Sequence, residues 1–413
     1  MARTVVQDLG ASRIREVANE GLGRTDVLPF WFGEPDQVTP DFIRDAAKAA
    51  LDAGDTFYTH NCGLPELREA LATYLSRLHR PIPATRIAVT SAGVSALMLL
   101  AQLIINPGDR VVAVTPLWPN LLEIPKILGA EVVQVPLQCG LTWTLDVDAL
   151  LAQLTPGTRA VFINSPGNPT GWVITRAQQQ RILMHCRRHG IWILADDVYE
   201  RLVFDAPCDA ASSASSDTSY CAAVAPAAAV AAVTAVHPGC APSFLDLATA
   251  DDRILCANSF SKSWLMTGWR LGWVVVPESM MADLGKLIEY NTSCAPGFVQ
   301  RAGIVAIEQG EPVIAATVAR YRASRDFLHA RLNALPGIAA PSPQGAMYLF
   351  FRLEGTHDTL ALCKQLVRDA GLGLAPGSAF GPQGEGFVRW CFAGSVERLA
   401  EGVARFERFL GSR

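Results

Sequence analysis

Short apolar segments alternate with longer amphipathic stretches along most of the chain beyond residue 85. Helical periodicity fills intervals such as 95–105 and 176–189. Segments of five or six residues rich in Val, Ile, Leu and Ala stand at 86–90, 110–114, 131–135, 160–164, 191–195, 254–259 and 271–276. Strands that are buried on both faces have this continuous apolar character, and helices return the chain between parallel strands. We therefore expect an α/β fold with a mostly parallel, seven-stranded sheet between helices.

The pattern changes after Tyr290, where a helical stretch extends to about residue 335. Three arginines, Arg320, Arg322 and Arg325, are expected on its solvated face. Beyond it, two apolar strands alternate with two helical segments, in the order 346–351, 358–370, 386–392 and 395–410. This mixture predicts a smaller α+β domain.

The length of 413 residues exceeds what one core of roughly 100–200 residues accommodates, so two domains are expected. We expect an N-terminal segment 1–45 that joins the small domain, a large domain 46–292 and a small C-terminal domain 293–413. Residues 205–243 are dominated by Ala, Ser, Pro and Thr and lack a clear period. They are expected to form a surface insertion that the chemistry does not need.

The charge balance excludes some partners. A net charge of −4 gives no electrostatic reason to bind nucleic acid or an anionic membrane. No stretch of 18 apolar residues exists, and the first residues lack the apolar centre of a secretory signal. We expect a cytoplasmic protein with small-molecule partners.

Ten cysteines are scattered without a CxxC pair and without a histidine at metal-ligand spacing. Scattered thiols in a chain of this length do not suit a disulfide framework. We therefore expect reduced, mostly buried cysteines and no metal site.

Two basic residues with unusual surroundings follow the strand at 254–259. Lys262 ends the run Asn-Ser-Phe-Ser-Lys, and Arg270 stands eight residues later within Met-Thr-Gly-Trp-Arg-Leu-Gly-Trp. A lysine in a cleft loses hydration, which lowers its pKa and lets it form a Schiff base with an aldehyde. The planar guanidinium of arginine suits a phosphate dianion. The pair is more specific than either residue alone.

Five blocks in this order resemble the class I and II aminotransferases, a fold type I family that uses pyridoxal phosphate (PLP). They are Gly-Glu-Pro-Asp at 33–36, Tyr58 with Gly-Leu-Pro-Glu-Leu-Arg at 63–68, Asn-Ser-Pro-Gly-Asn-Pro-Thr-Gly at 164–171, Asp-Asp-Val-Tyr-Glu at 196–200 and the block 259–272. The resemblance covers about residues 12–410 apart from the insertion. It implies the fold type I PLP-transferase architecture and PLP as cofactor.

The resemblance assigns residues to the cofactor ring. Asp196, at a strand end, matches the aspartate that keeps the pyridine nitrogen protonated, and its neighbour Asp197 is expected to be a structural or rim carboxylate. Tyr199 and Asn168 match side chains that hydrogen-bond the phenolic oxygen. Trp118 matches the aromatic residue that stacks on the ring.

The resemblance also assigns the phosphate. Ala92, Gly93 and Val94 match a turn whose backbone N–H groups bind it at a helix N-terminus. Many relatives have a hydroxyl residue where this chain has Ala92, so one side-chain contact is missing. Ser259 and Arg270 match the side chains that complete the phosphate site.

Arg389, inside an apolar strand, is costly to bury without a partner, and it matches the arginine that binds the substrate's α-carboxylate. Gly33 and Asn168 match its supporting contacts, and Tyr348 is expected either to line the pocket or to pack in the core. Tyr58 matches a tyrosine that reaches the phosphate of a neighbouring subunit, which implies a homodimer with shared active sites.

The implied activity is transfer of an amino group from an L-amino acid to a 2-oxo acid such as 2-oxoglutarate. Lys262, Asp196 and Tyr199 are the implied catalytic residues, with Lys262 as general base and acid. A PLP-dependent C–S β-lyase shares these motifs, and a PLP-sensing regulator is a second alternative.

Two further expectations concern detail. An aspartate-preferring branch of the family has a lysine where this chain has Val94, which cannot pair with a distal carboxylate. Neutral or aromatic donors are therefore expected to exceed aspartate in kcat/KM. The Thr115-Pro116 and Asn168-Pro169 bonds are expected to be cis.

Overall fold

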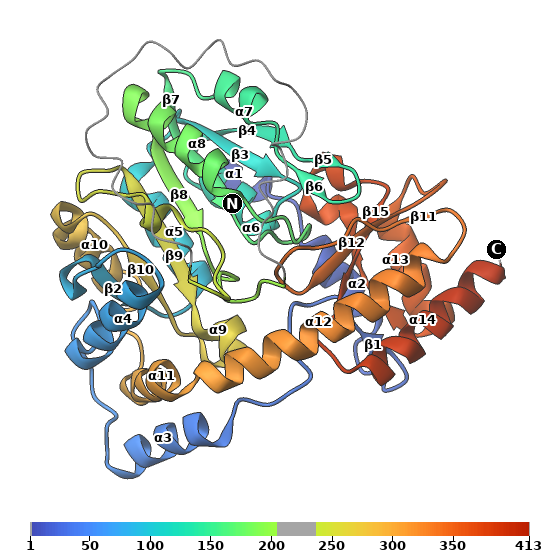
Figure 1. Ribbon diagram of the computed structural model, residues 1–413, viewed down its shortest axis with the longest axis horizontal. Helices are drawn as coiled ribbons and strands as arrows, with labels where there is room; N and C mark the ends of the chain where they lie inside the picture. The colour runs from blue at the N-terminus through green and yellow to red at the C-terminus, as the bar shows by residue number, and fades with distance from the viewer. Residues whose placement is uncertain (1, 205–236, 413) are drawn as a thin grey trace.

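Seven strands form the central sheet of the computed structural model, which describes residues 2–204 and 237–412 (Figure 1). Their order is β2 (Ile87–Thr90), β10 (Gly272–Val275), β9 (Ile254–Ser259), β8 (Trp192–Asp196), β7 (Thr158–Asn164), β3 (Arg110–Thr115) and β4 (Glu131–Pro136). Only β10 among these seven runs antiparallel to its neighbours. The prediction of a mostly parallel sheet is confirmed.

Alternation along each strand supplies the core on both faces of the sheet. In β3, Val111 and Ala113 belong to one hydrophobic cluster, whereas Val112 and Val114 belong to another. Successive side chains of a strand point to opposite faces, so a continuous apolar strand needs helices on both sides.

Helices cover these faces (Figure 1). They are α4 (Pro65–Leu78), α5 (Gly93–Ile104), α6 (Pro119–Ile127), α7 (Val147–Gln153), α8 (Arg176–His189), the short α9 (Phe260–Ser263) and α10 (Met281–Glu289). Helix α3 (Asp41–Asp52) lies apart from the sheet and packs on α11 (Gly297–Gln309). The expected bounds of α8 are confirmed, because local signals set both ends. Thr175 forms a capping box with Gln178, and Gly190 ends the helix in the left-handed conformation.

A four-stranded antiparallel sheet forms a second layer near the C-terminus. Its order is β11 (Ile338–Ala339), β12 (Tyr348–Leu353), β15 (Phe387–Cys391) and β14 (Ala375–Pro376). It packs with α13 (Thr359–Ala370) and α14 (Val396–Gly411).

The N-terminal segment reaches this C-terminal region. β1 (Leu28–Pro29) pairs in parallel with β13 (Leu372–Gly373), and α2 (Arg13–Glu20) packs on α13. The short elements also include α1 (Thr4–Gln7) and the hairpin of β5 (Gln138–Cys139) and β6 (Trp143–Thr144). The exact domain boundaries at residues 46 and 293 remain a prediction.

The long helical region is two helices, α11 (Gly297–Gln309) and α12 (Glu311–Asn333). They meet at Gly310, where a β-carbon would lie 2.2 Å from the Ala306 carbonyl oxygen and 2.5 Å from the Trp264 ring. The expected helical region is therefore confirmed, and packing against Trp264 leaves room only for a glycine where its two helices meet.

One arginine of α12 does not face solvent. Arg325 is buried, with its guanidinium 4.8 Å from the centroid of the Phe204 ring and a 3.3 Å hydrogen bond to the Pro343 carbonyl oxygen. Arg320 is half-buried and Arg322 is exposed. The expectation was wrong for Arg325 because its partners come from segments distant in sequence.

The expected insertion at 205–243 lies mostly outside the described residues, which resume at residue 237. Residues 240–243 are buried, and Ser243 Oγ donates a 2.7 Å hydrogen bond to Asp197 Oδ2. The prediction of a surface insertion was therefore wrong for these four residues.

Three further features of the described residues can be compared with the sequence predictions: the cis peptide bonds, the cysteines and the hydropathy of the helices. The peptide bonds Thr115-Pro116 and Asn168-Pro169 are cis as predicted, and Ser165-Pro166 is a third cis bond that was not predicted. The eight cysteines in the described ranges are free thiols, six of them buried. Among the described helices, none has the length and apolar character needed to cross a bilayer.

Candidate active site

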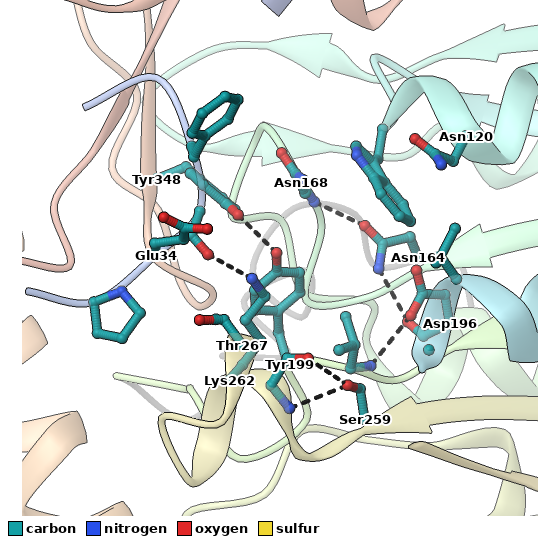
Figure 2. Close-up of a pocket in the computed structure, with 18 of the residues that line it drawn as sticks. Glu34, Asn120, Asn164, Asn168, Asp196, Tyr199, Ser259, Lys262, Thr267 and Tyr348 are labelled. Atoms are coloured by element: carbon teal, nitrogen blue, oxygen red, sulfur yellow. Dashed lines mark hydrogen bonds between the residues drawn. The ribbon is translucent and has the colours of Figure 1, made fainter. Parts of the chain in front are cut away.

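A cavity of about 650 Å³ lies where the ends of the central strands face the N-terminal segment and the C-terminal sheet. Figure 2 shows polar side chains from all three regions pointing into it. Of the expected site residues, those in its lining are Gly33, Gly93, Val94, Trp118, Asn168, Asp196, Tyr199, Ser259, Lys262, Arg270, Tyr348 and Arg389. The fold thus gathers in one place residues that are spread over most of the chain.

Asp196 ends strand β8 and is a buried carboxylate in this cavity. Burial raises its pKa to about 7, and the nearest charge that opposes this effect is Lys262. Its Oδ1 accepts a 3.3 Å hydrogen bond from the Val198 amide, and no ion pair joins it to another described residue. A cationic ring nitrogen placed beside Asp196 would therefore stabilise its charged form.

Lys262 stands at the C-terminal end of α9, directly after strand β9. Its Nζ donates a 2.5 Å hydrogen bond to the Gly33 carbonyl oxygen and lies 5.9 Å from the centroid of the Tyr199 ring. Burial lowers the pKa of this amine to about 8. The lowered pKa leaves a larger neutral fraction of this amine near neutral pH than an exposed lysine has, and the neutral amine is the form that acts as nucleophile or base.

The first turn of α5 forms an anion cradle. Its N-cap residue Ala92 has φ 146°, and no side chain caps the helix. Free N–H groups at a helix N-terminus bind anions, and Gly93 and Val94 supply them next to the cavity. A β-carbon on Gly272 would lie 2.8 Å from the Gly93 nitrogen, so strand β10 supports this turn closely.

Hydroxyl and guanidinium groups also line the cavity, and Ser259 adjoins the α5 turn, since a β-carbon on Gly93 would lie 3.1 Å from Ser259 Cβ. Ser259 Oγ donates a 2.8 Å hydrogen bond to Ser261 Oγ, and both side chains line the cavity. Arg270 also lines it, in the left-handed conformation with φ 54°. Its Nη1 donates a 2.5 Å hydrogen bond to the Thr267 carbonyl oxygen. These donors suit a phosphate group.

Arg389 is buried between aromatic rings on strand β15. Its guanidinium carbon lies 4.3 Å from the centroid of the Tyr348 ring and 4.8 Å from that of Phe380. Nη1 donates a 2.8 Å hydrogen bond to Asn168 Oδ1, and Nη2 donates to the Trp31 carbonyl oxygen. Nε is buried and has no hydrogen-bond partner among the described residues. A carboxylate in the cavity would neutralise this charge.

Tyr199 and Tyr348 meet inside the cavity. Their hydroxyl oxygens lie 2.7 Å apart and share a hydrogen bond (Figure 2). Burial raises the pKa of Tyr348 to about 12, so both groups remain protonated donors near neutral pH.

Two expected site residues do not line the cavity. Ala92 is buried and is the N-cap residue of α5, so only its backbone could take part in the expected phosphate contact. Tyr58 is 89% exposed, so the structure does not bring it into the site of its own chain. An exposed tyrosine is compatible with the expected contact to a second subunit, which stays a prediction.

Several lining residues were not expected from the sequence, among them Arg15, Phe32, Asn120, Asn164 and Thr267. Asn164 belongs to the 164–171 block, and its side-chain amide donates a 3.0 Å hydrogen bond to the Asp196 carbonyl oxygen. Its position in that block was a usable signal. No sequence signal marked Arg15, because an arginine in an amphipathic helix is usually an ordinary solvated residue.

Asp197 does not line the cavity and joins a buried polar network on the other side of the strand end. In this network, His79 Nδ1 lies 2.7 Å from Asp246 Oδ1, and Nε2 lies 3.2 Å from Glu200 Oε2. Cys240 lies close to His79 and Glu200. Both ring nitrogens face carboxylates, and these hydrogen bonds outweigh burial and raise the pKa of His79 to about 10. We therefore assign His79 as an imidazolium ion.

His79→Gln is expected to destabilise the protein by about 3 kcal/mol at pH 6.5, because it leaves the buried carboxylate of Glu200 without a cation, whereas Asp246 keeps its ion pair with Arg176. The folded-state pKa of about 10 exceeds the ordinary 6.5, so this contribution is complete below pH 6.5 and is lost as the pH rises towards 10. The difference in melting temperature between wild type and variant should shrink over that range. A difference that stays constant from pH 6.5 to 10 would contradict the imidazolium assignment.

The sequence and the fold of this chain are similar to those of known aminotransferases. The sequence profile described as aminotransferase class I and II matches residues 25–406. The chain is 32% identical over 403 residues to an aspartate aminotransferase of Pyrococcus horikoshii, covering 97% of this chain and 94% of that protein. It is 31% identical over 405 residues to aromatic-amino-acid aminotransferase 2 of Thermococcus litoralis, covering 97% and 95%. A single mutant of Thermus thermophilus aspartate aminotransferase matches with a TM-score of 0.85 and 28% identity over 99% of both chains.

Proposed function

The chain belongs to the class I and II aminotransferase family, and from this premise we propose that it moves the amino group of a neutral or aromatic L-amino acid to 2-oxoglutarate. The observation that carries the proposal is the meeting of Lys262, Asp196 and Arg389 in one cavity. These three residues supply an amine, a buried carboxylate and a buried guanidinium. This is the set of groups that an amino acid and a pyridine aldehyde need.

The described residues fit PLP, the cofactor on which this family generally depends. Asp196 would hold the ring nitrogen, and the uncapped turn of α5 with Ser259 and Arg270 would hold the phosphate. When bound, PLP supplies an electron sink for the bond that breaks at the substrate's α-carbon. Trp118 lines the cavity and is proposed to cover one face of the ring.

Arg389 is proposed to bind the substrate's α-carboxylate. Two of its nitrogens donate hydrogen bonds to Asn168 and to the Trp31 carbonyl oxygen. The rings of Tyr348 and Phe380 contact the guanidinium group and fix its orientation. A guanidinium held from several sides loses little entropy when a carboxylate arrives, which favours tight and oriented binding.

Lys262 is proposed to hold and move the proton of the substrate's α-carbon. Its lowered pKa of about 8 means that Nζ can accept a proton near neutral pH and release it again. The Gly33 carbonyl oxygen orients Nζ, and Tyr199 lies beside it.

The exposed Tyr58 supports a homodimer with shared active sites, as the family resemblance implies. Tyr58 is exposed and does not line its own chain's cavity, so we propose that it contacts the cofactor phosphate of a second subunit.

The donor preference is testable with Val94→Lys. Val94 lines the cavity without a charge, and an unpaired carboxylate there costs several kcal/mol, so neutral or aromatic donors should exceed aspartate in kcat/KM. The lysine variant should shift the preference towards aspartate by about tenfold or more. The measurement is a donor panel with 2-oxoglutarate as acceptor. Val94→Leu controls for size, and a wild type that prefers aspartate to every neutral donor would overturn the proposal.

The same preparation distinguishes transamination from the lyase alternative. Holoenzyme mixed with a donor in the absence of a 2-oxo acid should convert its cofactor stoichiometrically into the amino form, which absorbance reports. A lyase would instead release product over many turnovers and leave the cofactor in its aldehyde form.

A further inference from the structure

Four cationic side chains line the cavity within the described residues, and only three have a role so far. Lys262 is the amine, Arg270 faces the phosphate end and Arg389 faces the α-carboxylate. The fourth is Arg15. A dicarboxylic substrate has a second, distal carboxylate, and none of these three cations has been assigned to it.

Arg15 projects from helix α2, in the N-terminal segment. Its guanidinium carbon lies 4.6 Å from the centroid of the Phe32 ring, a cation–π contact. No hydrogen bond or ion pair joins its side chain to any other residue in the described ranges. The aromatic face therefore steadies the guanidinium while its N–H edges stay available.

The other charges of α2 are already paired. Glu16 binds Lys364 at 3.0 Å, Glu20 lies 3.5 Å from Arg368, and Arg13 donates a 3.4 Å hydrogen bond to the Ser378 carbonyl oxygen. Arg15 thus differs from its neighbours on the helix in facing the cavity without a partner.

Phe32 connects Arg15 to the reacting groups. It immediately precedes Gly33, whose carbonyl oxygen accepts the hydrogen bond from Lys262 Nζ, and both residues line the cavity. Glu34, the next residue, also lines it and is exposed. A second substrate carboxylate near Glu34 would be repelled by that side chain unless a cation lay close by, and Arg15 is a cation in this part of the cavity.

We propose that Arg15 binds the distal carboxylate of a five-carbon dicarboxylate, the 2-oxoglutarate or glutamate of the second half-reaction. The proposal rests on 2-oxoglutarate being the acceptor. Arg15 enters from the exposed side, so it serves the longer dicarboxylate, whose distal carboxylate extends one methylene beyond that of aspartate. Neutral donors use the apolar lining around Val94, and the dicarboxylate uses Arg15.

The test is calorimetric binding to holoenzyme of two probes, glutarate and pentanoate, which differ by one carboxylate. Wild type should bind glutarate more tightly than pentanoate, and Arg15→Gln should remove about tenfold or more of that preference while pentanoate affinity stays unchanged. Arg15→Lys should keep part of it. Arg13→Gln is the matched control on the same helix and should leave both affinities unchanged.

An unchanged glutarate preference in Arg15→Gln, with an unaltered cofactor spectrum, would overturn the role of Arg15. The proposed function is checked separately by adding 2-oxoglutarate to the wild-type enzyme in its amino form. Failure of that conversion, while another 2-oxo acid succeeds, would overturn the acceptor and leave the binding result as an independent measure of Arg15.

Discussion

Lys262→Ala is expected to lower kcat/KM by about 10⁴-fold, the largest loss for any single substitution in this cavity. Nζ of Lys262 is the amine that lies beside Tyr199 and has a pKa lowered by burial. The other lining groups are not expected to replace it, because a guanidinium group is a poor base and Asp196 is proposed to hold the ring nitrogen. The measurement is steady-state kinetics with the best donor of the panel.

Two controls make this result specific. Lys286→Ala removes an exposed lysine that pairs with Asp283 and should leave kcat/KM unchanged. Borohydride reduction of wild-type holoenzyme should fix the cofactor covalently, and peptide mapping should locate it on Lys262. A cofactor mass mapped to any other lysine would disprove the assignment.

Arg389→Lys is expected to lower kcat/KM for amino acids by about 100-fold or more, although the positive charge is kept. A fork held by Asn168 and the Trp31 carbonyl oxygen binds a carboxylate through two parallel hydrogen bonds, which an ammonium group cannot reproduce. Disturbing a buried hydrogen-bonded charge pair costs about 2–5 kcal/mol, and each 1.4 kcal/mol is tenfold.

The informative comparison is between phenylalanine and 2-phenylethylamine, which lacks the carboxylate. The variant should lose most of the wild-type preference for phenylalanine while its cofactor spectrum stays normal. Arg352→Lys, an exposed position on the neighbouring strand β12, is the matched control and should change neither rate. A variant that slows both compounds equally would show that Arg389 supports the fold rather than the carboxylate.

The strands and most helices could be predicted because their signals are local. A strand buried on both faces must be apolar through its centre, as in β3 and β7, and α8 has its capping residues next to it in sequence. The junction of α11 and α12 at Gly310 and the burial of Arg325 could not be predicted in this way. The residues that contact them, Trp264 at Gly310 and Phe204 and Pro343 at Arg325, come from other parts of the chain.

The candidate site divides in the same way. The sequence by itself determined the family, the residue types of the cavity and their order along the chain, because cofactor chemistry demands a lysine, a carboxylate and two arginines within recognisable blocks. Only the tertiary structure decided that Arg15 lines the cavity without a partner, that Asp197 faces the His79 network and that residues 240–243 are buried. The physical reason is that the burial and the ion pairing of a side chain depend on which distant segments pack together. The local sequence around a single charged residue does not predict these contacts.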